Sequence, residues 1–138
     1  SDEAYGDGQL KWPVPTRSYI SSYFGWRTLY GRPNYHKGID IPGSAGTNIV
    51  AADAGKVLKV SKLTYGYGWH VIIDHGNGVS TLYAHCSRLD VSVGDYVEKG
   101  QVVAGIGTTG NSTGNHVHFE VRINGVQQNP LNYVKQPS

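Results

Sequence analysis

The chain has 138 residues, which suits one domain whose core is large enough to fold without cross-links. Its formal net charge of +2 is too small to predict nucleic-acid binding, and no apolar run is long enough to span a bilayer. The 19 glycines show no collagen-like period, so they indicate many turns and favour an all-β architecture. The single cysteine, Cys86, excludes an intramolecular disulfide framework.

The sequence divides into a lead-in, an ordered body and a tail. Residues 1–10 are polar and contain glycine, which predicts a flexible lead-in. We expect the folded domain at residues 11–134 and a short tail at residues 135–138. Since Ser1 is not a natural initiator residue, we expect the chain to be an excised or processed piece of a longer protein.

The first part of the body places a histidine and an aspartate close together in the sequence. Residues 18–26 mix aromatic and small polar residues and predict a strand, whereas residues 27–34 contain glycine and proline and predict a loop. On a regular strand His36 and Asp40 would share a face but lie about 13 Å apart. A bend at Gly38 would bring their side chains together.

The middle of the chain predicts short strands separated by turns. Alternating or continuous apolar residues indicate strands within residues 49–60, 71–74, 79–84 and 91–107. The turn residues at 75–78 predict a hairpin, because Asn-Gly is a strong hairpin signal. We find no long helical period, which again favours an all-β fold.

Residues 116–123 show the clearest strand pattern in the chain. Apolar residues alternate with polar ones, and Asn124-Gly125 then predicts a hairpin turn. His116 and His118 would therefore stand on one face of the strand, about 6.6 Å apart along it. A purely structural strand has no obvious need for two such histidines.

Three segments thus offer side chains suited to metal binding and proton transfer: His36 with Asp40, then His85, then His116 with His118. Two histidines and one carboxylate, with a fourth position open, form a recognised catalytic zinc set. Nitrogen ligands without thiolates also suit zinc better than magnesium or calcium, which prefer oxygen ligands. The remaining two histidines would be available for proton transfer, but these patterns do not say which histidines bind the metal.

Several motifs together resemble those of the lysostaphin/LytM-type zinc metallopeptidases. They occur in the family's order at residues 24–27, 36–40, 82–85, 93–101 and 110–120. The resemblance extends over roughly residues 12–130 and implies antiparallel sheets with a narrow substrate groove walled by loops. Asn115 departs from the family pattern, which often has proline at this position, but this change removes no candidate ligand.

The resemblance also implies the role of each candidate residue. It makes His36, Asp40 and His118 the ligands of one zinc ion per chain, and His85 and His116 the catalytic pair beside it. It further implies a peptidoglycan endopeptidase that acts outside the cell, in the cell wall or in the periplasm. We expect a monomer whose partners are bacterial peptidoglycan peptides, with no nucleic acid and no membrane segment in this chain.

Five loop residues are weaker candidates for contacts around the site. Tyr30 and Asn111 each lie in a loop near a motif, and Tyr65, Tyr67 and Trp69 could form a wall of the groove. Each is equally compatible with a local role, in a turn or in packing against the sheet.

Alternative functions remain open at this point. Within the peptidase reading, we expect cleavage of the bond between D-alanine and a diamino acid; the alternative is cleavage of glycyl-glycine cross-bridges. A catalytically inactive cell-wall binding or regulatory relative is another possibility. A Cys–His hydrolase is disfavoured because Cys86 directly follows His85, so on a strand the two side chains point to opposite faces.

Overall fold

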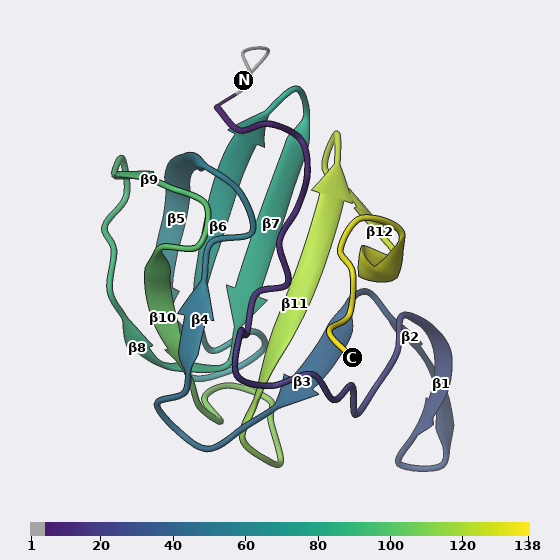
Figure 1. Cartoon of the computed structure of the whole chain (residues 1–138). Coiled ribbons are helices and arrows are strands. Elements are labelled where there is room, and N and C mark those ends of the chain that lie inside the picture. The colour runs from purple at the N-terminus through teal and green to yellow at the C-terminus, as the bar shows by residue number, and fades with distance from the viewer. Residues whose placement is uncertain (1–4) are drawn as a thin grey trace.

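The computed structural model describes residues 5–138 and shows an almost entirely β protein (Figure 1). One seven-stranded sheet has the order β12-β11-β7-β6-β5-β9, with β3 paired to β11. A second sheet has the order β4-β10-β8, and β1 and β2 form a separate hairpin. All of these pairings are antiparallel, so the predicted fold class is confirmed.

The strands are β1 (Gly25–Leu29), β2 (Arg32–His36), β3 (Ile39–Pro42), β4 (Asn48–Val50), β5 (Gly55–Lys62), β6 (Trp69–Gly76), β7 (Val79–Ala84), β8 (Cys86–Leu89), β9 (Tyr96–Val97), β10 (Val102–Ile106), β11 (His116–Ile123) and β12 (Val126–Gln128). A short 3-10 helix, Pro130–Asn132, follows β12.

Both hairpins predicted from turn residues are present. The turn between β6 and β7 places Asn77 and Gly78 at φ values of 53° and 78°, and the turn between β11 and β12 places Asn124 and Gly125 at 51° and 82°. Successive positive φ values are what a tight turn needs to match the twist of its strands, and Asn-Gly tolerates them best. The sequence signal and the observed turn therefore have one physical cause.

The prediction for residues 18–34 is wrong. Residues 18–24 form no strand, and Ser22 makes only an isolated bridge to Asp40, whereas Gly25 and Trp26 already belong to β1. The predicted loop at residues 27–34 instead contains most of the β1–β2 hairpin, which extends away from the main sheet in Figure 1. Its turn residues, Tyr30 and Gly31, have φ values of 53° and 73°.

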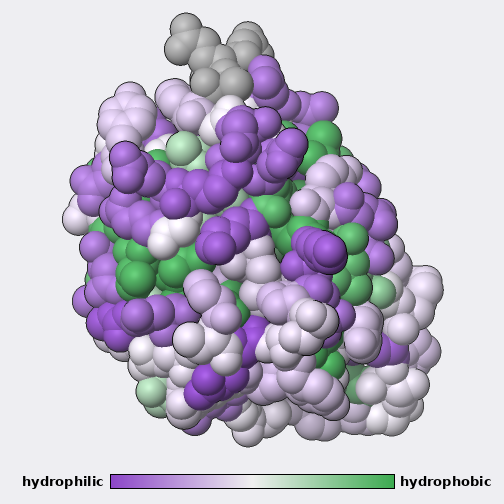
Figure 2. Space-filling model, viewed as in Figure 1, coloured by the Kyte–Doolittle hydropathy of each residue, from purple (hydrophilic) through white to green (hydrophobic). Residues whose placement is uncertain are grey.

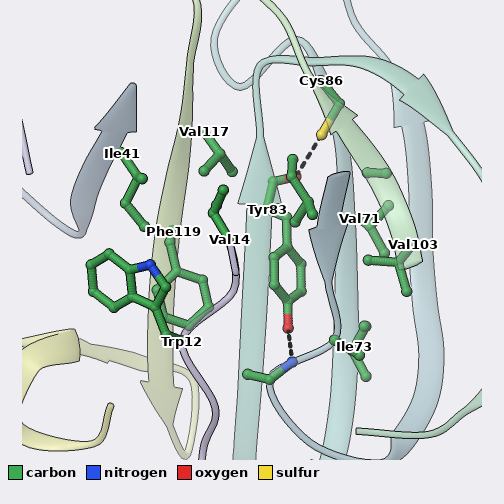
Figure 3. Packing of buried hydrophobic residues seen from close by; sticks show 14 of the residues in the cluster. Trp12, Val14, Ile41, Val71, Ile73, Tyr83, Cys86, Val103, Val117 and Phe119 are labelled. Atoms are coloured by element: carbon green, nitrogen blue, oxygen red, sulfur yellow. Dashed lines mark hydrogen bonds between the residues drawn. The ribbon is translucent and has the colours of Figure 1, made fainter. Parts of the chain in front are cut away.

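The core lies between the large sheet and the segments that cross its inner face. Tyr83 and Phe119 are fully buried there with their ring centroids 5.5 Å apart, and the buried Trp12 and Val14 pack onto the same cluster (Figure 3). The hydroxyl of Tyr83 accepts a hydrogen bond of 3.0 Å from the backbone N–H of Ala52. This packing holds β7 and β11, which carry candidate site residues at their ends, in fixed positions.

The beginning of the described chain also contacts the body of the domain. The backbone N–H groups of Tyr5 and Gly6 donate to the carbonyl of His75, and that of Gly8 donates to the Asp53 carboxylate. Residues 1–4 of the predicted lead-in lie outside the described residues.

On the face seen in Figure 2, polar residues surround small apolar patches. No helix among residues 5–138 is long and apolar enough to cross a membrane.

Candidate metal centre and active site

The pairing of β3 with β11 brings two candidate ligands together. Asp40 lies directly opposite His118 in this pairing, and His36 arrives at the end of β2, just before the bend at Gly38. A Cβ atom at Gly38 would lie 2.3 Å from the carbonyl oxygen of Phe119. Only glycine lets the bend pack this closely against β11, as the sequence predicted for this position.

The donor atoms of these three residues converge on one point. The Nε2 of His36 lies 3.1 Å from the Asp40 Oδ1 and 3.1 Å from the His118 Nδ1, and the last two atoms are 3.0 Å apart. Four-coordinate zinc with bonds of 2.0–2.1 Å requires ligand atoms roughly 3.3–3.4 Å apart. All three residues are buried, and the group could hold a metal ion.

In His36 and in His118, one ring nitrogen hydrogen-bonds away from this point, which determines that the other nitrogen faces it. His36 Nδ1 lies 3.0 Å from the carbonyl oxygen of Tyr23, which can only accept, so its Nε2 carries the lone pair. His118 shows the reverse arrangement, because its Nε2 donates to Glu120 Oε2 at 2.8 Å. Burial alone raises the pKa of Asp40, but the imidazoles of His118 and His36 beside it outweigh burial and hold this pKa well below its usual value.

The two remaining histidines lie beside the candidate ligands. His85 and His116 have ring centroids 4.9 Å apart, and His116 Nε2 is 3.7 Å from Asp40 Oδ1. Each donates its Nδ1–H to a backbone carbonyl, His85 to Thr109 at 2.7 Å and His116 to Gly114 at 2.9 Å. The Nε2 atom of each ring is therefore the one available for chemistry in the cavity.

His85 combines an unusual backbone conformation with an altered pKa. Its φ of 64° lies in the left-handed region, which a non-glycine residue adopts at a cost of about 1–3 kcal/mol. Burial lowers the pKa of His85 to about 4, assisted by the nearby His116 and His118 and opposed by the hydrogen bond to Thr109. The imidazole is therefore neutral at neutral pH and able to accept a proton.

A cavity of about 720 Å³ joins all five of these residues. Its lining comprises Arg27, Leu29, Tyr30, His36, Asp40, Gly66, Tyr67, His85, Gly110, Asn111, Ser112, Thr113, His116 and His118. The lining includes the candidates Tyr30, Tyr67 and Asn111 but not Tyr65 or Trp69. Tyr65 is exposed, and the ammonium of Lys62 lies 4.6 Å from the centroid of a Trp69 ring.

Two loops form one wall of the cavity and touch backbone to backbone. A Cβ atom on Gly68 would lie 2.4 Å from the carbonyl carbon of Thr109, and one on Gly110 would lie 2.4 Å from the Gly68 nitrogen. The backbone N–H of Asn111 also donates to the carbonyl of Gly66 at 2.9 Å. The loop before β6 and the loop before β11 are thereby joined.

Thr109 lies where the two loops meet, and the sequence alone gives no sign of its role. Its side-chain Oγ1 accepts from the backbone N–H of Trp69 at 3.0 Å and donates to the carbonyl of Cys86 at 2.7 Å. Together with the bond from His85 to its own carbonyl, these contacts tie the end of β7 to both loops. A lone threonine in a polar loop gives no sequence signal for such a role.

Arg27 is the second such residue, because the motif at residues 24–27 contains it but indicates no role for its side chain. Its Nε donates to Asn34 Oδ1 at 2.9 Å and its Nη1 donates to Ser22 Oγ at 2.8 Å. The same Nη1 lies 3.6 Å from Asp40 Oδ2, the carboxylate oxygen other than the one at the metal-binding point. The predicted loop at residues 27–34 hid this role, because only a strand fixes the direction of the side chain.

Cys86 has no chemical role in this cavity. Its side chain is fully buried and its Sγ lies 3.5 Å from the carbonyl of Tyr83 (Figure 3). Burial raises the pKa of the Cys86 thiol to about 12, so the reactive thiolate does not form near neutral pH.

Comparisons with known proteins agree with this geometry. Over 114 residues the chain is 44% identical to the DD-carboxypeptidase/endopeptidase Mpg of Neisseria meningitidis, covering 81% of this chain and 26% of that protein. Over 125 residues it is 36% identical to the murein hydrolase activator NlpD of Escherichia coli, covering 91% of this chain and 31% of that protein. The chain thus spans less than a third of the length of these relatives.

Solved structures also resemble the chain. A zinc-containing peptidase from Vibrio cholerae superposes with a TM-score of 0.82 at 32% identity, covering 88% of this chain and 39% of that one. The catalytic domain of lysostaphin from Staphylococcus simulans superposes with a TM-score of 0.78 at 28% identity, covering 87% of this chain and 93% of that one. The model of peptidase family M23 matches residues 34–130, which include every candidate ligand and both remaining histidines. The chain therefore belongs to peptidase family M23.

Proposed function

We propose that this chain is a zinc-dependent endopeptidase that cleaves peptide cross-links of bacterial peptidoglycan, at the bond between D-alanine and a diamino acid. The observation that carries the proposal is the convergence of His36 Nε2, Asp40 Oδ1 and His118 Nδ1 within 3.1 Å of one another. Two imidazoles and one carboxylate suit zinc with an open coordination position. When bound, zinc supplies Lewis acidity and makes hydroxide available at neutral pH.

The residues around this point would divide the remaining work. His85 and His116 direct Nε2 atoms toward the cavity, and their Nδ1–H groups are engaged with backbone carbonyls. One neutral imidazole can take a proton from the attacking water on its Nε2, and the imidazolium so formed can give that proton to the leaving amine. A protonated imidazole can also stabilise the negative charge that develops on the carbonyl oxygen. We assign these roles to His85 and His116 as a pair.

The rest of the cavity would bind and orient the peptide. Tyr30 and Asn111 both line it, and their hydroxyl and amide groups can hydrogen-bond to a peptide backbone. The location outside the cell, in the wall or in the periplasm, follows from this substrate.

The choice of bond rests on a relative. The name of the Neisseria protein describes carboxypeptidase and endopeptidase activity of the DD type, and that protein is 44% identical to this chain over 114 residues. We therefore place the D-alanine cross-link ahead of the glycyl-glycine bridge.

A regulatory function is the second candidate, because the chain is also 36% identical to a protein named as an activator of murein hydrolases. The complete set of candidate ligands and the paired histidines favour the enzyme, since a regulator that never cleaves needs neither.

Digestion of purified peptidoglycan tests the proposal. Walls with direct stem-peptide cross-links and walls with glycine bridges are incubated with the protein, with and without a zinc chelator, and the fragments are identified by mass spectrometry. We expect chelator-sensitive release from the direct cross-links and none with His118→Ala. Release from glycine bridges alone would overturn the choice of bond. Absence of both zinc binding and release would favour the regulatory function.

A further inference from the structure

The face of β11 that carries His118 continues into a buried ionic cluster that the proposed mechanism does not use. Side chains of alternate residues share one face of a strand, so Glu120 and Arg122 follow His118 along the same face. Glu120 is fully buried, with 0% of its surface exposed. A buried carboxylate is costly unless every oxygen is paired, so its partners indicate its purpose.

The two oxygens of Glu120 serve different partners. Oε1 accepts from Arg122 Nε at 2.9 Å. Oε2 accepts from His118 Nε2 at 2.8 Å and from the hydroxyl of Tyr67 at 2.6 Å. Both oxygens of Glu120 thus accept hydrogen bonds, as the oxygens of a carboxylate do.

A simple structural ion pair does not account for this arrangement. Pairing with Arg122 would satisfy one oxygen and leave the other free to face any neighbour. Instead the second oxygen accepts from His118 Nε2, the ring nitrogen that faces away from the other candidate ligands. The hydroxyl of Tyr67, in the loop before β6, donates to the same oxygen. The Tyr67 ring also stacks on the His118 ring, with centroids 5.8 Å apart and an interplanar angle of 27°.

The consequence lies in the tautomer of His118. An imidazole whose Nε2–H is held by a carboxylate keeps its lone pair on Nδ1, and Nδ1 is the atom that lies within 3.1 Å of His36 Nε2 and Asp40 Oδ1. We propose that Glu120, clamped by Arg122 and Tyr67, is a positioning residue that holds His118 in its metal-binding tautomer and orientation. This inference rests on the metal site of the proposed function.

Zinc affinity gives the first test. In Glu120→Gln an amide replaces the carboxylate, so only one acceptor oxygen remains for the three donors and the NH₂ group must face at least one of them. We expect zinc binding, measured by competition with a chromogenic chelator, to weaken about 10–100-fold, the range usual for such outer contacts. Tyr67→Phe removes one donor and leaves the ring stacked, so we expect a smaller loss of affinity.

A matched control separates positioning from general destabilisation. Asp53 is also almost fully buried, but its partners include the backbone of Gly8 and Ala54, and no candidate ligand is among them. Asp53→Asn should reduce stability and leave zinc affinity within about twofold of the parent. Equal loss of zinc affinity in Asp53→Asn and Glu120→Gln would overturn the inference.

The tautomer itself can be observed. In the zinc-loaded parent, long-range ¹H–¹⁵N spectra of the His118 ring should show a protonated Nε2 and an unprotonated Nδ1. Glu120→Gln should show a mixture of the two tautomers. An unchanged tautomer together with unchanged zinc affinity would refute the role of Glu120 and leave the zinc site intact. A parent chain that binds no zinc would instead refute the proposed function, so the two failures are distinct.

Discussion

His85 donates its Nδ1–H to the backbone carbonyl of Thr109 at 2.7 Å, so a loop residue decides which nitrogen of this histidine faces the cavity. The side chain of Thr109 holds that carbonyl in place through its contacts with Trp69 and Cys86. The loop before β11 therefore supplies both His116, at its end, and the group that orients His85.

Replacing Thr109 should uncouple catalysis from metal binding. Thr109→Val removes the hydroxyl and leaves two backbone groups without their partner, each worth about 1–3 kcal/mol when buried. We expect the free energy of unfolding to fall by about 1–3 kcal/mol or more, because these backbone groups lose their partner. We expect kcat/KM to fall about tenfold, because His85 loses its fixed orientation. Zinc affinity should stay within about twofold, since no candidate ligand contacts Thr109. Thr109→Ser keeps the hydroxyl and is the control; full turnover by Thr109→Val would contradict this coupling.

Gly38 is expected to tolerate no side chain. In Gly38→Ala the new Cβ would lie 2.3 Å from the Phe119 carbonyl oxygen, so β3 and β11 must move apart. We expect at least a tenfold loss of zinc affinity and a decrease in unfolding free energy of about 1–3 kcal/mol. Gly114→Ala is the control, because nothing lies within 4 Å of a Cβ there. Calorimetric zinc titration and urea unfolding measure both quantities; parent-like zinc binding in Gly38→Ala would show that the strands can adjust.

Arg27 should support Asp40 rather than the fold as a whole. Arg27→Gln removes the guanidinium that lies 3.6 Å from Asp40 Oδ2, so the carboxylate loses part of its orientation. The Arg27 side chain is 28% exposed, so we expect a change in unfolding free energy below about 1 kcal/mol and a several-fold loss of zinc affinity. Arg32→Gln on the same hairpin is exposed and is the control. Equal zinc affinities of the two variants would show that Arg27 does not support the metal-binding residues.

Acid should destabilise the chain through His75, which does not line the cavity. Burial lowers the pKa of His75, although the hydrogen bond to the Ala54 carbonyl and the nearby Asp53 and Asp74 oppose this. The unfolded state, with a pKa of about 6.5, then binds the proton more readily than the folded state. Stability due to neutral His75 is therefore present above pH 6.5 and is lost as the pH falls below it.

Urea unfolding of the zinc-free protein between pH 7.5 and 5.5 measures this loss. We expect the decrease in unfolding free energy to be smaller in His75→Gln than in the parent, because that variant has no proton to gain at this position. The ring nitrogens of His75 hydrogen-bond to the carbonyl of Ala54 and the hydroxyl of Thr81, and neither partner is a histidine. We therefore expect the other histidines to contribute equally to the pH dependence of the parent and of the variant. Parallel pH profiles for parent and variant would exclude His75 as the cause.

Much of the fold could be predicted because local signals and the final structure have the same cause. The Asn-Gly turns at residues 77–78 and 124–125 and the alternation in β11 depend on a few adjacent residues, so they can be recognised without knowing their tertiary neighbours. The bend at Gly38 could be predicted for a similar reason, since His36 and Asp40 can meet only if the chain turns between them.

The β1–β2 hairpin could not be predicted in this way. Its turn is Tyr30-Gly31, and tyrosine is not a residue that signals two successive positive φ values. Pro33 also argues against a strand, yet it is tolerated because this sheet has only two strands and its proline can face away from the partner. Arg27 was missed as a consequence. The roles of Thr109 and of the contact between Gly68 and Gly110 depend on tertiary neighbours that no local pattern encodes.

That glycine contact has a consequence for how a bulky polymer could enter the cavity. Because Gly68 and Gly110 are in backbone contact, we expect the loops that carry Tyr67 and Asn111 to move together. The β1–β2 hairpin also lines the cavity, through Arg27, Leu29 and Tyr30, and among residues 5–138 its two strands pair only with each other. We therefore expect the width of the entrance to change through movement of the hairpin, not of the loops beside His85.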